Sequence, residues 1–183
     1  MPLQSESCGL FALMLMQGSR RKARSSSSGE LLTLEEQDRS LWNRADIERG
    51  CNMLARARER GPYVLQASIA QCHAVAKDAA SSDWSRIVSL YDELLSINPS
   101  PVISLNRAIA VGMRDGPDAG LALLDAVTAE LEGFHLVPAA QADLLWRAGR
   151  IPEAAVRYGE AIAQAQTTEE RAQLRRRLAK LWA

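Results

Sequence analysis

The stretch LYDELLSINPSPVISLNRAIAV, residues 90–111, contains one amphipathic segment, a pair of prolines and a second amphipathic segment. Apolar residues recur every three or four positions on both sides of the prolines, which is typical of α-helices. Pro99 and Pro101 cannot continue the first helix, but proline is tolerated in the first turn of the next one because its missing N–H has no intrahelical partner there. The stretch therefore predicts two helices joined by a short turn.

The same arrangement recurs through residues 62–166, where six predicted helices form three pairs. Ser82, Gly116 and Gly149 occupy the turn inside each pair, at spacings of 34 and 33 residues. A helix–turn–helix period near 34 residues is typical of tetratricopeptide repeats. The repeats are degenerate, since Asp125 stands in the middle pair where the consensus has an aromatic residue.

The segment before these pairs, residues 1–61, predicts further helices. Its first apolar run predicts a short helix, and residues 18–30 follow as a flexible loop that is basic and rich in serine. Residues 31–61 predict one long helix, and Thr33 precedes Glu36 at the spacing of a capping box. We therefore expect an N-terminal helical segment with one interruption.

The last segment, residues 167–183, predicts a helix that caps the array. It begins with a threonine and two glutamates and ends with arginines and a lysine, which complements the helix dipole. One helix pair cannot bury its own apolar face, whereas about three stacked pairs can. The predicted fold is all-α: a right-handed superhelix of tetratricopeptide-like helix pairs with an N-terminal helical segment and a C-terminal capping helix.

Charge and cysteine content restrict the class of protein. The chain has 22 Lys and Arg against 22 Asp and Glu, and this zero net charge disfavours a globally basic nucleic-acid-binding protein. Cys8, Cys51 and Cys72 are few and far apart, which disfavours a disulfide framework and is typical of a reducing compartment. The apolar run at 8–16 is shorter than the roughly 20 residues that cross a bilayer, and it lacks the features of a signal peptide. We expect a cytoplasmic protein without a membrane partner.

The sequence contains no motif that indicates catalysis or a cofactor. His73 and His135 are its two histidines, and neither belongs to a metal-binding pattern such as H-E-x-x-H. A phosphate-binding loop and a nucleophile elbow are also missing. We therefore expect that the protein is not an enzyme and that it binds no metal or cofactor.

Stacked tetratricopeptide pairs line a concave groove with the first helix of each pair, and this groove is the expected protein-binding site. The candidate residues are Asn106, Arg107, Met113, Asp143 and Trp146. Two roles are open for Asn106, because a groove asparagine can bind a peptide backbone or can bond to the preceding turn of its own helix. Trp146 can likewise anchor a partner or pack near the core.

Several stretches resemble one known family. They are LFALMLMQGSRRKAR at 10–24, LEEQDRSLWNRADIERG at 34–50, and the patterns E-x-Q-D-R-S-x-W at 35–42 and P-S-P-V-x-x-L-N-R-A-x-A-V at 99–111. The chain resembles, over roughly residues 8–181, the C-terminal extension of extracytoplasmic-function (ECF) RNA polymerase sigma factors that carry a tetratricopeptide-like tail.

The resemblance implies a bacterial regulatory domain that acts in transcription initiation by protein–protein contacts. Its partners are expected to be the sigma regions of the same factor, the RNA polymerase core, or both. DNA would be bound only through sigma regions that this sequence lacks, since no promoter-melting helix precedes Cys8 and no recognition helix follows the repeats. The alternative is a free-standing tetratricopeptide adaptor that binds a peptide or protein in its concave groove.

Overall fold

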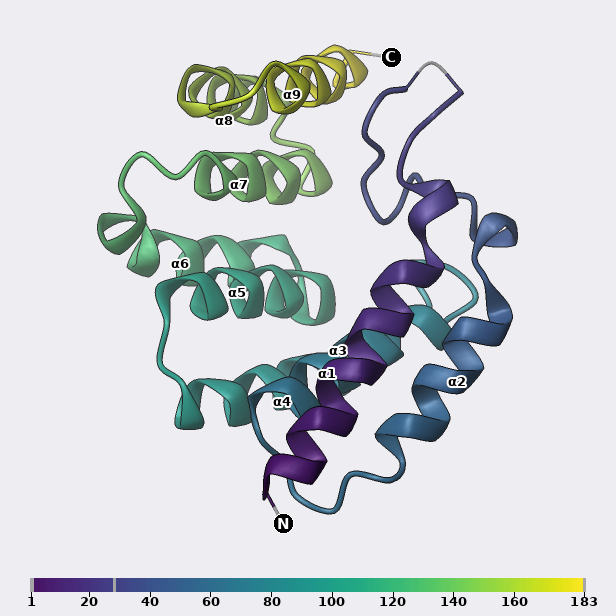
Figure 1. Ribbon diagram of the computed structural model, residues 1–183. Helices are drawn as coiled ribbons and strands as arrows, with labels where there is room; N and C mark the ends of the chain where they lie inside the picture. Colours follow the sequence, from purple (N-terminus) through teal and green to yellow (C-terminus); the bar gives the residue numbers. More distant parts are fainter. Residues whose placement is uncertain (1, 28, 183) are drawn as a thin grey trace. The chain divides into compact units, whose positions relative to one another are not determined.

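Prolines, glycines and capping side chains define the ends of the helices in the computed structural model, which describes residues 2–27 and 29–182. Proline stands at one of the first two positions in the helices that begin at Pro62, Pro101, Pro117 and Ile151. The α-helices are α1 (Pro2–Ser19), α2 (Arg44–Leu54), α3 (Pro62–Val75), α4 (Trp84–Ile97), α5 (Pro101–Asp115), α6 (Pro117–Val127), α7 (Leu136–Arg147), α8 (Ile151–Gln164) and α9 (Thr168–Lys180) (Figure 1). Short 3₁₀ helices lie at η1 (Arg21–Ala23), η2 (Arg39–Leu41) and η3 (Ala129–Leu131).

The predicted all-α class is confirmed, because the described residues form nine α-helices and no β-strand. Helices α3 to α8 fall where the sequence predicts three helix pairs. The superhelical winding of these pairs stays a prediction. None of the helices in the described part of the chain combines the length and the apolar character needed to cross a membrane.

The chain divides into two compact units, Met1–Pro99 and Ser100–Ala183. In the first unit α1 packs on α2 and α3, and α3 packs on α4. One of its cores is formed by Ala12, Met16, Leu54, Val64 and Ala67. The first predicted pair, α3 and α4, therefore shares a unit with the N-terminal helices rather than with the later pairs.

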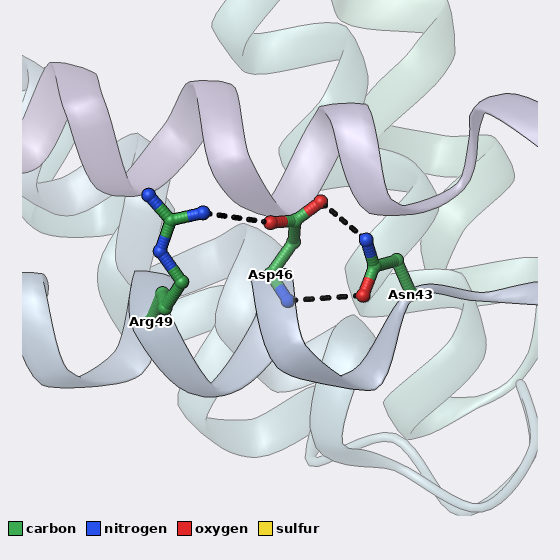
Figure 2. A network of polar contacts seen from close by, with 3 residues as sticks. All are labelled: Asn43, Asp46 and Arg49. Atoms are coloured by element: carbon green, nitrogen blue, oxygen red, sulfur yellow. Dashed lines mark hydrogen bonds and ion pairs between the residues drawn. The ribbon is translucent and has the colours of Figure 1, made fainter.

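The expected long helix over 31–61 is wrong at both ends, because α2 begins only at Arg44 and already ends at Leu54. Asn43 caps it: its Oδ1 accepts the N–H of Asp46 at 3.3 Å, and its Nδ2 donates to Asp46 Oδ2 at 2.7 Å (Figure 2). Figure 2 also shows the second Asp46 oxygen paired with Arg49 at 3.2 Å. This local network ends the preceding loop and starts the helix.

The predicted capping pair forms but starts no α-helix. The N–H of Thr33 donates to Glu36 Oε2 at 2.9 Å, yet a turn and then η2 follow. Asp38 accepts the N–H of Ser40 at 2.8 Å, so side-chain oxygens here satisfy backbone groups that a helix would use.

The expected loop at 18–30 is partly folded. Helix α1 continues to Ser19, η1 follows, and Ala23 is buried. Ser25 and Leu31 form an isolated antiparallel bridge that closes the rest of the segment. Within the expected loop, Ser28 lies outside the described residues.

In the second unit each helix from α5 to α9 packs on the next one along the chain, and α5 also contacts α7 (Figure 1). Two apolar clusters form its core. The first joins α5, α6 and α7 through residues such as Leu105, Leu124 and Leu144. The second joins α7, α8 and α9 through residues such as Tyr158 and Leu174. Helix α9 thus packs at the end of the array, as expected of a capping helix.

Candidate protein-interaction surface

The residues proposed for the groove come from α5 and α7, which are in contact within the second unit. On α5, Asn106 and Met113 are seven positions apart and therefore lie on one face, two turns from each other. Asn106 is exposed, and its Nδ2 donates to the carbonyl oxygen of Val102 at 3.0 Å. Of the two roles left open, the structure thus shows the bond to the preceding turn. Arg107, its neighbour, is partly buried.

Asp143 on α7 is partly buried and bonds to two other side chains of the protein, and its expected role in the groove stays a prediction. Its Oδ1 accepts the hydroxyl of Tyr158 on α8 and also pairs with Nη2 of Arg177 on α9. Arg177 additionally lies over the Tyr158 ring, with its Cζ 5.6 Å from the centroid. This cluster of Asp143, Tyr158 and Arg177 joins three helices and holds α9 on the stack.

The environment of Tyr158 explains why this cluster is structural. The side chain is 1% exposed, and its ring packs with apolar residues of α7 and α9. Burial raises the pKa of Tyr158 far above its ordinary value, and the negative charge of Asp143 raises it further. The hydroxyl therefore remains a hydrogen-bond donor, and a charged oxygen acceptor satisfies it.

Trp146 is the candidate residue with a large apolar side chain exposed to solvent. It lies in the last turn of α7, three positions after Asp143, and its side chain is 42% exposed. An indole that is half in solvent is a suitable anchor for a partner, because aromatic side chains contribute strongly when an interface buries them. The candidate set thus separates into an exposed part, Asn106 and Trp146, and the internally bonded Asp143.

A hollow on α6, α7 and α8 was not predicted from the sequence. It has a volume of about 330 Å³, and Gln141 and Leu145 of α7 line it together with Asp125 of α6 and Val156 of α8. Gln141 is buried, and its Nε2 donates to Asp125 Oδ1 at 3.1 Å. The sequence did contain a signal for this hollow. Asp125 occupies in the middle pair the position that the buried Tyr158 occupies in the last pair, and an acidic side chain fills less space than an aromatic ring.

Ionic pairs surround this hollow. Arg157 and Glu160 pair at 2.8 Å along α8, and Arg150, the residue before α8, pairs with Glu153 in its first turn. These are exposed pairs one turn apart, each worth at most about 1 kcal/mol. Elsewhere in the described chain, no three His, Cys, Asp or Glu side chains are grouped in a way that would hold a metal ion.

Comparison with known proteins gives two matches. A model described as a family of unknown function (DUF6596) matches residues 1–58. An uncharacterized protein of Rhizobium meliloti (strain 1021) is 41% identical over 180 residues, which cover 97% of this chain and 43% of that protein. The chain thus spans less than half the length of this curated relative. No solved structure shows significant similarity to the present chain.

Proposed function

We propose that this chain is the C-terminal regulatory domain of an ECF-type RNA polymerase sigma factor. In this role it acts in transcription initiation by contacting other proteins in the bacterial cytoplasm. The observation that carries the proposal is the resemblance of residues 35–42 and 99–111 to that family. The Rhizobium meliloti relative supports the proposal: nearly all of this chain aligns with less than half of that protein, as expected of a domain within a larger factor.

The second unit offers the contact surface for such a role. Asn106 and Trp146 lie on α5 and α7, two helices that touch each other, and both side chains are exposed. A zero net charge favours a protein partner over a phosphate backbone, whose binding requires many cationic contacts. We therefore propose that α5 and α7 bind the sigma regions of the same factor, the RNA polymerase core, or both.

The test is direct binding of the purified chain to purified RNA polymerase core and to separately expressed sigma regions. We expect Trp146→Ala to weaken binding by about tenfold or more, as an exposed aromatic anchor does. Trp182→Ala is the matched control, since Trp182 is also exposed but lies beyond the end of α9. Failure of the unmodified chain to bind either partner, or an equal loss in both variants, contradicts the proposal.

The second candidate is a free-standing adaptor for a peptide or protein, and the hollow beside Gln141 and Val156 favours it because it is lined by both polar and apolar groups. An adaptor of this kind needs no sigma region. Selection of peptides from a random library on the immobilised chain separates the two functions. Enriched peptides that compete with the sigma regions support the sigma-factor role, whereas enriched peptides together with no sigma binding support the adaptor.

A further inference from the structure

The hollow on α6, α7 and α8 contains one acidic side chain that no cation of the described chain neutralises. Its charged lining residues are three carboxylates and two guanidiniums: Asp125, Glu153, Glu160, Arg150 and Arg157. Arg150 pairs with Glu153, and Arg157 pairs with Glu160, so these four charges compensate one another. The carboxylate of Asp125 bonds to a neutral amide instead, and the hollow therefore keeps a net negative charge.

That amide belongs to Gln141, a buried side chain with one bonding group left. Gln141 is 5% exposed and lines the hollow, and its Nε2 donates to Asp125 Oδ1 at 3.1 Å. The hydrogen bonds of the described residues leave Gln141 Oε1 without a donor. A group that enters the hollow and donates hydrogen bonds would satisfy this oxygen as well as the carboxylate.

The rest of the lining is apolar and consists of Leu121 on α6, Leu145 on α7 and Val156 on α8. Val156 is 62% exposed, so part of this apolar surface faces solvent. Long cationic side chains lay their methylene groups on such surfaces and keep their charged ends beside polar groups. The volume of about 330 Å³ is at the lower end of the roughly 300–1,000 Å³ found for small-molecule sites, which is sufficient for one side chain.

Charge and hydrogen bonding decide which kind of group suits the hollow. An anion would be repelled by Asp125. An apolar or aromatic side chain would cover the carboxylate without neutralising it, which costs free energy. A cation compensates the charge and supplies the missing donors. In the last helix pair the ring of the buried Tyr158 has the position of Asp125, so only the middle pair leaves this space open to a ligand.

We propose that this hollow receives a lysine or arginine side chain of a partner protein. The charged end pairs with Asp125 and donates to Gln141 Oε1, while the methylene groups lie against Leu145 and Val156. The partner is therefore basic at the point of contact. This inference is separate from the sigma-factor role, because Trp146 does not line the hollow.

The test follows the backbone amide signals of Asp125 and Gln141 by NMR in the full chain. The probes are Nα-acetyl-arginine amide and Nα-acetyl-lysine amide, and Nα-acetyl-norleucine amide is the uncharged reference at equal ionic strength. We expect saturable shifts with at least one cationic probe and none with the reference. A five-residue peptide with one arginine between alanines is expected to bind more tightly than the capped arginine, since its neighbouring residues reach Val156. Equal affinity would favour a free amine over a protein partner and overturn that part of the proposal.

Two substitutions of Asp125 test the recognition of the cation. Asp125→Asn removes the charge and is expected to weaken probe binding by about fivefold, as the loss of an exposed ion pair does. Asp125→Tyr places in the hollow the ring that the last helix pair has at this position, and it is expected to abolish the saturable shift of the Gln141 signal. Circular dichroism checks that both variants remain folded.

The matched control is Glu130→Gln, which removes one negative charge from an exposed residue of η3 outside the hollow. Its probe affinity is expected to stay unchanged. Trp146→Ala, the test of the sigma-factor role, is expected to leave it unchanged too, so the two proposals can fail separately. No saturable shift with either cation, an equal shift with the norleucine probe, or equal losses in Asp125→Asn and Glu130→Gln would each overturn the proposal.

Discussion

Gly120 stands at the closest approach of α5 and α6, and its replacement by alanine tests the packing of the second unit. A Cβ built on Gly120 lies 2.7 Å from Gly112 Cα, 2.7 Å from Leu144 Cδ1 and 2.9 Å from the carbonyl oxygen of Ala108. Carbon atoms in contact are normally about 3.5–4.0 Å apart. Two of these three neighbours belong to the backbone of α5, which cannot rotate away, so the two helices must move apart by about 1 Å.

The magnitude follows from two opposing contributions. Overpacking a core typically costs about 1–3 kcal/mol, and contact with backbone atoms places Gly120→Ala at the upper end. Alanine is about 1 kcal/mol more favourable than glycine inside a helix. We therefore expect a net loss of about 2 kcal/mol in the free energy of unfolding. With an m-value of about 1–2 kcal/mol/M, the urea midpoint falls by about 1–2 M.

Urea unfolding followed by helical circular dichroism measures this loss, and two further glycines calibrate it. A Cβ on Gly159, an exposed position inside α8, meets nothing within 4 Å, so Gly159→Ala is expected to stabilise by up to about 1 kcal/mol. A Cβ on Gly112 meets mainly the side-chain end of Leu144, at 2.7 Å, which can adjust, so its cost is expected to be smaller than at Gly120. A Gly120→Ala protein as stable as the unmodified chain would refute the reasoning.

Four further outcomes are expected. Gly149→Val should lower the melting temperature, because Gly149 has φ +74° in the turn after α7, a conformation that costs a side-chain-bearing residue about 1–2 kcal/mol. Tyr158→Phe should cost about 1–2 kcal/mol in urea unfolding and leave partner affinity unchanged, since its hydroxyl only satisfies Asp143. Asn106→Ala should retain the circular dichroism spectrum and reduce affinity for the sigma regions in a titration; an unchanged affinity would remove Asn106 from the interface. Burial, and then two nearby arginines, lower the pKa of His73 from 6.5 to about 4 in the folded chain. As the pH falls, the imidazole of the unfolded chain is therefore protonated before that of the folded chain. Stability should fall by up to about 3 kcal/mol as the pH drops from 6.5 to 4, and His73→Gln should flatten that part of the profile.

The helix pairs could be predicted from the sequence because their signals are local. Pro101 and Pro117 lie in the first turns of α5 and α6, where a missing N–H is harmless. Gly149 ends α7 with a Schellman motif, in which its N–H donates to the carbonyl of Trp146 and the N–H of Arg150 to that of Leu145, both at 2.9 Å. Such signals depend on a few neighbouring residues, so one sequence suffices to find them.

The role of Asp143 could not be predicted in the same way. Its repeat position indicates the groove-lining helix, and that placement on α7 agrees with the structure. Its partners, however, lie 15 residues away on α8 and further still on α9, and nothing in the local pattern names them. Periodicity thus predicts the helix on which a side chain lies, whereas the contacts of a charged side chain are set by tertiary packing.

The segment at 35–42 shows the same division more sharply. Its apolar spacing suggests a helix, yet Arg39 bonds to carbonyl oxygens 34 and 37 residues away, at the end of α3. Those carbonyls have no partner inside their own helix, so a distant arginine that satisfies them fixes the loop against α3. Asp38 and Asn43 have extended backbones and accept the N–H groups of Ser40 and Asp46, so a continuous helix does not run through this segment. Trp42, between them, is buried against Ala23, Ile47 and Ala74. The pattern E-x-Q-D-R-S-x-W is therefore specific because it combines one long-range contact, made by Arg39, with one local stop at Asp38, and Asn43 directly after it provides a second stop.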